Sequence, residues 1–185
     1  MNDPSITDQH LAARALGKDG EAFQLLYKRY VRRVYAYHLV RTGDEQTAQD
    51  LTSETFLAVL DHLSTYRVSG SFGAWLMGIA HHKLVDYYRS QSMALSLDGI
   101  ADLPAADPLP EKRVTQQDDL AKLSRVLSLL TPERADALSL RYFAQLNFSE
   151  VGRVMGKSPA AVKMLVARGL QELRDRLGVV HLEEE

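Results

Sequence analysis

The stretch from Phe148 to Leu177 places the tightest constraint on the fold, because it divides into two helices around a short turn. The hydroxyl of Ser149 can accept a hydrogen bond from a free backbone N–H, so Ser149 is the predicted N-cap of the first helix. Gly156 is predicted to end that helix, since glycine readily adopts a positive φ. Ser158 then caps a second helix that begins at Pro159. This pattern predicts a helix-turn-helix, although an ordinary helical hairpin with a basic exposed face fits it too.

The second of these helices has two different faces. Its apolar residues recur at helical spacing and are predicted to face the core: Val162, Leu165, Val166, Leu170, Leu173 and Leu177. The residues left to face outward are Lys163, Met164, Ala167, Arg168 and Gln171. An outward face of this kind would contact the major groove if the helix reads DNA.

The composition limits what the chain can be. It has 22 Lys and Arg against 24 Asp and Glu, which gives a net charge of −2, and it has no cysteine. Disulfides and thiolate metal sites are therefore excluded, and the N-terminus lacks the basic flank and apolar core of a signal peptide. No apolar run is long enough to span a bilayer, so we expect a cytoplasmic protein without membrane insertion. Because phosphate neutralisation drives DNA affinity, a nearly neutral chain is expected to bind DNA poorly without a larger partner.

The N-terminal half predicts helices over residues 8–19, 21–41 and 45–64, with Gly20 breaking the first and Gly43 and Asp44 separating the last two. In the helix over 45–64, Asp50 and Glu54 share one face because they are four residues apart. Two acidic side chains on one face fit either a solvated surface or a docking site for a basic partner.

A polar loop over 66–71 leads into a predicted helix over 72–90, where aromatic and basic side chains alternate. Such a mixture suits single-stranded nucleic acid, since bases stack on rings and cations follow the backbone. The alternative is that Phe72 and Trp75 belong to the core. The adjacent His81 and His82 point about 100° apart on a helix and cannot hold one metal ion together, so no metal site is expected.

Helical periodicity fails between Gln91 and Gln117, where three prolines and four acidic residues indicate a linker. Two more helices are predicted, over 118–130 and from Thr131 to Tyr142. The expected fold is therefore all-α, with two small helical domains joined by a flexible acidic linker. We divide the chain into residues 1–92, the linker 93–117, and residues 118–185, which contain the helix-turn-helix.

Four segments carry a resemblance to a known family. They are LYKRYVRRVY at 26–35, GDEQTAQDLTSETFLAVL at 43–60, GSFGAWLMGIAHHKLVDYYR at 70–89 and LTPERADALSLRYFAQLNFSEVGRVMGKSPAAVKMLVARGLQELR at 130–174. In their order and spacing, the chain resembles a bacterial sigma factor of the extracytoplasmic function (ECF) group within the sigma-70 family. The resemblance implies a promoter-specificity subunit that binds core RNA polymerase and promoter DNA, is not an enzyme and needs no cofactor. It also implies control by an anti-sigma factor.

The resemblance assigns three sets of residues. Core polymerase would bind Asp50, Leu51, Glu54 and Phe56. The −10 element would be captured and opened by Arg67, Ser69, Phe72, Trp75, His82, Lys83, Tyr87 and Arg89. The −35 element would be read by Lys157, Ser158, Lys163, Met164, Ala167, Arg168 and Gln171.

The chain departs from the family pattern at three places. Gln49 and Ser53 replace an acid and a glutamine beside the polymerase-binding residues, His81-His82 replaces Arg-Asn, and Met164-Leu165 stands where Arg or Ser is common. We expect altered polymerase affinity, an unusual and pH-sensitive −10 preference, and a −35 contact that depends more on shape.

Two other classes of protein stay open on the sequence. A conventional transcription regulator would bind specific duplex DNA tightly without polymerase. A helical metal-dependent hydrolase would use His38, His62, His81 or His82, but these residues lack helical pairing with carboxylates.

Overall fold

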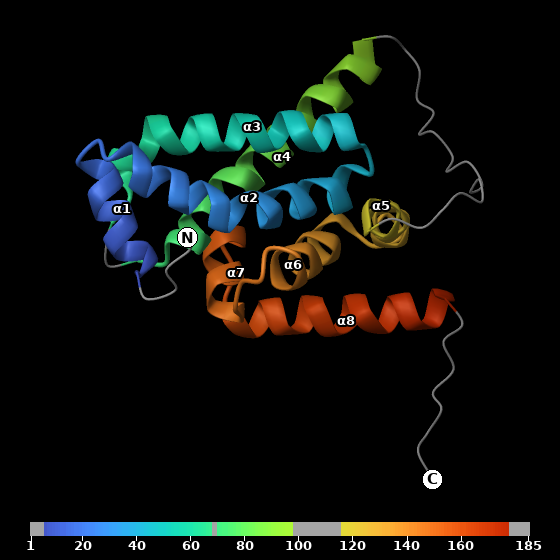
Figure 1. The fold of residues 1–185 in the computed structure, drawn as a ribbon. Helices are drawn as coiled ribbons and strands as arrows, with labels where there is room; N and C mark the ends of the chain where they lie inside the picture. The colour runs from blue at the N-terminus through green and yellow to red at the C-terminus, as the bar shows by residue number, and fades with distance from the viewer. Residues whose placement is uncertain (1–5, 68–69, 98–115, 178–185) are drawn as a thin grey trace.

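The computed structural model describes residues 6–67, 70–97 and 116–177, and within these ranges the chain is built of α helices joined by short turns (Figure 1). The elements are α1 (Asp8–Leu16), α2 (Gly20–Thr42), α3 (Glu45–His62), the 3-10 turn η1 (Leu63–Thr65), α4 (Phe72–Leu97), α5 (Gln116–Leu127), α6 (Pro132–Tyr142), α7 (Phe148–Met155) and α8 (Pro159–Leu177). The expected all-α fold is confirmed for the described residues.

Helices α1 to α4 form the N-terminal module, and short polar residues set where its helices begin. The carboxylate of Asp19 accepts hydrogen bonds from the first N–H groups of α2, and Asp44 accepts one from Thr47 at the start of α3. Gly43 ends α2 with a φ of 70°, as glycine permits. The prediction for Gly20 was wrong, because Gly20 is the first residue of α2 and α1 already ends before Gly17.

The C-terminal module contains α5 to α8. Thr131 lies at the N-cap of α6. The N-cap of α7 is Asn147 and not Ser149: the Asn147 side chain accepts from the Glu150 N–H, and the Glu150 carboxylate accepts from the Asn147 N–H. This reciprocal arrangement satisfies two free donors, which one serine inside the helix cannot do. Gly156 ends α7 with a φ of 65° and the Ser158 hydroxyl accepts from Ala161 at the start of α8, both as predicted.

Helix α4 is longer than the sequence analysis predicts, since it continues from Ser90 to Leu97. The added residues include Met93, Ala94 and Leu95, which favour helices, and no proline occurs between Ser90 and Pro104. Helix α5 likewise begins at Gln116. Residues 93–97 and 116–117 therefore belong to helices, while residues 98–115 of the predicted linker lie outside the described residues.

The two modules pack against each other. Helices α5 and α6 contact α2, and α7 contacts α4, as Figure 1 shows by the position of the C-terminal helices under α2. The buried apolar side chains of both modules belong to one continuous cluster. Ser124 of α5 lies so close to Gly43 that a Cβ atom there would be 2.8 Å from its hydroxyl. The sequence analysis treated the modules as tethered and did not predict this contact.

None of the described helices combines the length and the apolar character that crossing a membrane requires.

Candidate polymerase and nucleic-acid interfaces

Helix α3 presents an exposed acidic and apolar face. Asp50 and Glu54 are exposed, and Leu57 and Leu60 beside them have 62% and 50% of their surface accessible. Asp61 continues the same face one turn further on. Negative charge around exposed leucines is what a partner with a basic, partly apolar surface would bind. We call Asp50, Glu54, Leu57, Leu60 and Asp61 the docking face.

The structure separates the four residues that the resemblance assigns to polymerase binding. Asp50 and Glu54 lie on the docking face, whereas Leu51 and Phe56 are only 5% and 6% exposed. The Phe56 ring packs edge-on against Tyr27, with ring centroids 4.7 Å apart. Leu51 and Phe56 thus hold α3 against α2 and do not reach a docked partner in this conformation. The sequence analysis gave no signal for the exposure of Leu57.

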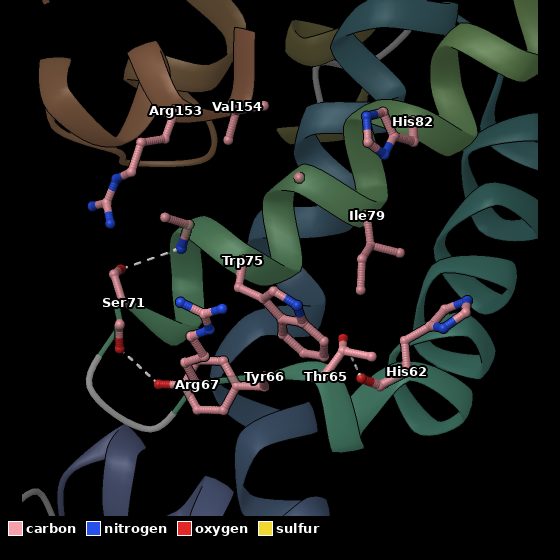
Figure 2. A pocket seen from close by; sticks show the side chains of 13 residues that line it. His62, Thr65, Tyr66, Arg67, Ser71, Trp75, Ile79, His82, Arg153 and Val154 are labelled. Atoms are coloured by element: carbon pink, nitrogen blue, oxygen red, sulfur yellow. Dashed lines mark hydrogen bonds between the residues drawn. The ribbon is translucent and has the colours of Figure 1, made fainter. Parts of the chain in front are cut away.

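A cavity of about 560 Å³ opens between the end of η1, the loop before α4, and α4 itself (Figure 2). Its lining is His62, Thr65, Tyr66, Arg67, Gly70, Ser71, Ala74, Trp75, Gly78, Ile79, His82, Arg153 and Val154. The volume and the aromatic and basic lining suit an unstacked nucleic-acid base.

The loop at this cavity is held at both ends. The Tyr66 hydroxyl donates to the Gly70 carbonyl at 2.7 Å, and the Gly70 N–H donates to the Arg67 carbonyl at 2.8 Å. The Ser71 hydroxyl accepts from the Ala74 N–H at 3.2 Å and caps α4. Arg67 is exposed at the rim. Ser69, another predicted −10 residue, lies outside the described residues.

The two aromatic residues at the start of α4 differ in exposure: one is buried in the core and the other is accessible. Phe72 is only 2% exposed and packs among Tyr30, Tyr66 and Trp75. The alternative that Phe72 belongs to the core therefore holds, and Phe72 is not available for stacking. Trp75 is partly exposed and lines the cavity, so it is the ring a base can reach.

The two histidines of α4 have different surroundings. His82 is exposed and lines the cavity. His81 is turned the other way, where its Nδ1 lies 2.9 Å from the Tyr37 hydroxyl. Burial lowers the pKa of His81, against the opposing effect of Asp136. His82 is therefore the histidine of this pair that faces the cavity, and the described residues contain no group of three candidate metal ligands.

The remaining predicted −10 residues follow α4 away from the cavity. Lys83 forms an ion pair with Glu54 of the docking face, with 3.4 Å between Nζ and Oε2. Arg89 is exposed and pairs with Asp86. Tyr87 is half-buried and its ring lies 5.5 Å from that of Tyr88. A basic and aromatic track thus extends along α4 from the cavity.

Helix α8 carries the predicted groove-reading face. Lys163, Met164, Ala167, Arg168 and Gln171 are all exposed, and Met164 is 52% accessible. A cation–π contact positions the Lys163 side chain, because its ammonium group lies 5.6 Å from the centroid of the Phe148 ring.

The opposite face of α8 packs mostly as predicted, with Val162 and Val166 buried and Leu165, Leu170 and Leu173 against the core. Leu177 was predicted to face the core but is 52% exposed, because it is the last residue of the helix. At the other end, Lys157 pairs with Glu133 of α6 at 3.0 Å and Ser158 caps the helix.

Two family models match the chain in this order. Sigma-70 region 2 matches residues 26–93, and sigma-70 region 4 matches residues 126–175. RNA polymerase sigma factor NccH of Alcaligenes xylosoxydans xylosoxydans is 30% identical over 178 residues, which cover 94% of this chain and 95% of NccH. ECF RNA polymerase sigma factor BldN of Streptomyces coelicolor is 35% identical over 166 residues, or 88% of this chain and 63% of BldN. The chain belongs to the ECF sigma factors of the sigma-70 family.

Two solved structures share the fold of this ECF sigma factor. CnrH, in complex with the cytosolic domain of CnrY, has a TM-score of 0.70 at 22% identity and covers 94% of this chain and 99% of its own. RpoE of Bartonella quintana, in complex with the anti-sigma factor NepR, has a TM-score of 0.72 at 17% identity and covers 87% and 99%. Region 2 of the sigma factor contains the docking face and most of the residues that line the cavity. Region 4 contains Arg153 and Val154 of the cavity lining and the exposed face of α8.

Proposed function

We propose that this ECF sigma factor directs promoter-specific initiation by dividing three tasks among three surfaces. The docking face of α3 binds core RNA polymerase, the cavity and α4 capture and open the −10 element, and the exposed face of α8 reads the −35 element. Residues 1–92 form the polymerase and −10 module, and residues 118–185 form the −35 module. The observation that carries the proposal is that one chain pairs an exposed helix-turn-helix face with a base-sized cavity beside Trp75.

Strand opening needs no nucleotide hydrolysis in this scheme. A base that leaves the duplex enters the cavity, and stacking on an aromatic ring contributes on the order of 1–3 kcal/mol per base. Trp75 supplies the accessible ring, while Phe72 and Tyr66 hold it in place. Arg67 and Arg89 are exposed and can neutralise phosphates beside the displaced strand.

Regulation by an anti-sigma factor is part of the proposal. BldN and RpoE are sigma factors, and the solved RpoE is bound to the anti-sigma factor NepR. An anti-sigma factor that co-purifies from unstressed cells would support this part, and its absence there would count against it. A cytoplasmic location follows from the same proposal, since the polymerase is there.

The test combines co-purification with core RNA polymerase and run-off transcription from a library of promoter fragments. The double variant Asp50→Arg/Glu54→Arg reverses the charge of the docking face and is expected to abolish both polymerase binding and initiation. Glu45→Arg is the matched control, because Glu45 is exposed on α3 about 140° around the helix from Asp50. Tight specific binding of duplex DNA by the chain alone, without effect on polymerase, would instead indicate a conventional regulator.

A further inference from the structure

Asp8, the first residue of α1, is held by two residues of α2. Its Oδ1 accepts a hydrogen bond from the Arg29 guanidinium at 2.7 Å, and its Oδ2 accepts one from the Tyr30 hydroxyl. It also lies in the first turn of α1, where the free N–H groups favour a negative charge. The Asp8 side chain is 27% exposed. A carboxylate bound in this way has a fixed position relative to α2.

Tyr30 carries this contact to the start of α4. Its side chain is buried, and its ring centroid lies 5.5 Å from that of Phe72. The ring also fits closely against the first turn of α4, because a Cβ atom on Gly73 would lie 3.1 Å from the Tyr30 hydroxyl. The hydrogen bond to Asp8 therefore fixes the end of the ring that touches α4.

The accessible ring of the cavity rests on the same group of aromatic side chains. The Trp75 ring centroid lies 5.6 Å from that of Phe72 and 5.3 Å from that of Tyr66, and Figure 2 shows Tyr66 beside Trp75. Burial raises the pKa of Tyr66, and the charge of Asp8 raises it further, so Asp8 acts on Tyr66 as well. Asp8 is thus linked to both rings that support Trp75.

Helix α1 has other contacts that keep it in place. Leu11 and Ala12 have no exposed surface, and Arg14 pairs with Asp19 before α2 at 2.7 Å. Removal of the Asp8 carboxylate is therefore expected to release Tyr30 without detaching α1. Asp8 also precedes residue 26, at which the match to sigma-70 region 2 begins.

We propose that Asp8 is a positioning residue for capture of the −10 base: through Tyr30 and Phe72, it holds Trp75 where a base can stack on it. This proposal rests on the proposed function, because it takes the cavity to be the −10 site. A ring that is already held in place loses little further freedom when the base arrives, so the base binds more tightly.

The mobility of Trp75 tests the first half of the proposal. Trp75 is the one tryptophan of the chain, so the decay of its fluorescence anisotropy reports the motion of this ring alone. Asp8→Ala and Tyr30→Phe are expected to add a fast component to the decay. Tyr27→Phe is the matched control, because Tyr27 lies on the same helix but packs against Phe56 of α3, and it should leave the decay unchanged.

Base capture is tested with the polymerase holoenzyme and promoter fragments that carry an abasic site at each −10 position in turn. With the original chain, the abasic site at the captured position is expected to weaken binding by about fivefold or more, since one stacked base is lost. With Asp8→Ala or Tyr30→Phe, the same abasic site should weaken binding by about twofold or less, because the residue and the base act on one contact. Asp8→Asn keeps an oxygen that can accept from Tyr30 and should retain most of the original penalty.

The abasic penalty separates positioning from a general loss of stability. A merely destabilised variant binds intact and abasic fragments more weakly by the same factor, so an unchanged penalty in Asp8→Ala and Tyr30→Phe would overturn the inference. An unchanged anisotropy decay in both variants would overturn it as well. Far-ultraviolet circular dichroism checks that each variant keeps its helices, and Tyr30→Phe provides the test if Asp8→Ala does not fold.

Failure of the proposed function has a different signature. If the holoenzyme with the original chain showed no penalty at any abasic −10 position, the cavity would not capture a base, and the inference would fall with the proposed function. If the original chain showed the penalty and the variants kept it, only the role of Asp8 would be refuted.

Discussion

Leu51 and Leu57 belong to the same helix, but they have opposite surroundings. Leu51 is 5% exposed against the core, while Leu57 is 62% exposed on the docking face. We expect Leu51→Ala to lower the free energy of unfolding by about 2–5 kcal/mol, because it leaves a cavity. Leu57→Ala should leave stability within about 0.5 kcal/mol of the original and weaken polymerase binding. Urea denaturation and polymerase pull-down measure the two effects, and the reverse pattern would refute the docking face.

His38 is a titratable residue in the core of the N-terminal module. It is fully buried between α2 and α3, its Nε2 lies 3.2 Å from the Thr55 hydroxyl, and its Nδ1 has no hydrogen-bond partner in the described structure. Burial lowers its pKa to about 3, so the folded protein keeps the imidazole neutral.

The lowered pKa of His38 makes the free energy of unfolding depend on pH, and the sign of that dependence follows from the direction of the shift. Because the pKa of His38 is depressed below the unfolded value of about 6.5, its contribution to stability is complete above about pH 6.5 and is lost as the pH falls toward 3. Between pH 6 and 5, the unfolding free energy should decline with a slope approaching about 1.4 kcal/mol per pH unit from this residue. His38→Gln should reduce the slope in urea titrations. An unchanged slope would show that His38 is not responsible, although His81, whose pKa is also lowered by burial, adds a slope of the same sign.

Among the helices, the N-terminus of α7 is a place where the sequence prediction and the structure differ. Ser149 and Asn147 both favour helix N-caps, but only Asn147 has a glutamate three residues later to complete a reciprocal cap. Asn147→Ala is therefore expected to lower stability by about 0.5–2 kcal/mol, while Ser149→Ala should have little effect. Thermal unfolding of the two variants measures the difference, and a larger loss from Ser149→Ala would restore the sequence prediction.

Two helical glycines differ in the space around them. A Cβ on Gly152 of α7 would lie 2.5 Å from the Lys157 carbonyl oxygen, whereas nothing lies within 4 Å of one on Gly78 of α4. Gly152→Ala should thus distort the turn between α7 and α8 and lower both stability and −35 binding. Gly78→Ala should raise helix stability by about 0.5–1 kcal/mol. Promoter-fragment binding and thermal unfolding of the two variants measure these effects. Equal effects of the two substitutions would contradict the difference in space around Gly152 and Gly78.

The helices could be predicted because their signals are local. Periodicity located the faces of α3 and α8, and Gly43, Asp44, Gly156 and Ser158 marked helix ends where the structure has them. The end of α4 was missed because no residue near Ser90 stops a helix. The burial of Phe72 depends on Tyr30 of α2 and on Tyr66, which precedes α4, so a pattern within one helix could not decide it.

At the scale of the molecule, the contact between modules is the feature that the sequence analysis lacked. Arg41 and Asp136 are 95 residues apart, and neither has a local pattern that distinguishes it from an ordinary surface charge. The family resemblance placed the three functional surfaces but gave no information on how the modules sit together. Only the packed structure shows that α7 shares the cavity with region 2.

The nearly neutral charge of the whole chain also has a measurable consequence. With a net charge of −2, promoter affinity depends on a few locally placed cations. For the polymerase complex on a promoter fragment, Arg168→Ala should reduce the slope of log affinity against log salt by about one. Arg125→Ala, at an exposed position on α5, should leave the slope unchanged. If neither substitution changed the slope, Arg168 would not be a DNA contact.

The contact between α7 and α4 is intramolecular, because both helices belong to one polypeptide. The fraction of molecules in which the contact is formed therefore follows the rules for a tethered partner. A tethered partner acts at an effective concentration that can reach the millimolar range for short connections, so a weak contact is enough to keep it occupied. The occupied fraction is then independent of how many copies of the chain a cell makes. Overexpression alone would raise the amounts of chain with packed modules and of chain with separated modules in equal proportion, and only a ligand that prefers one form would change their ratio.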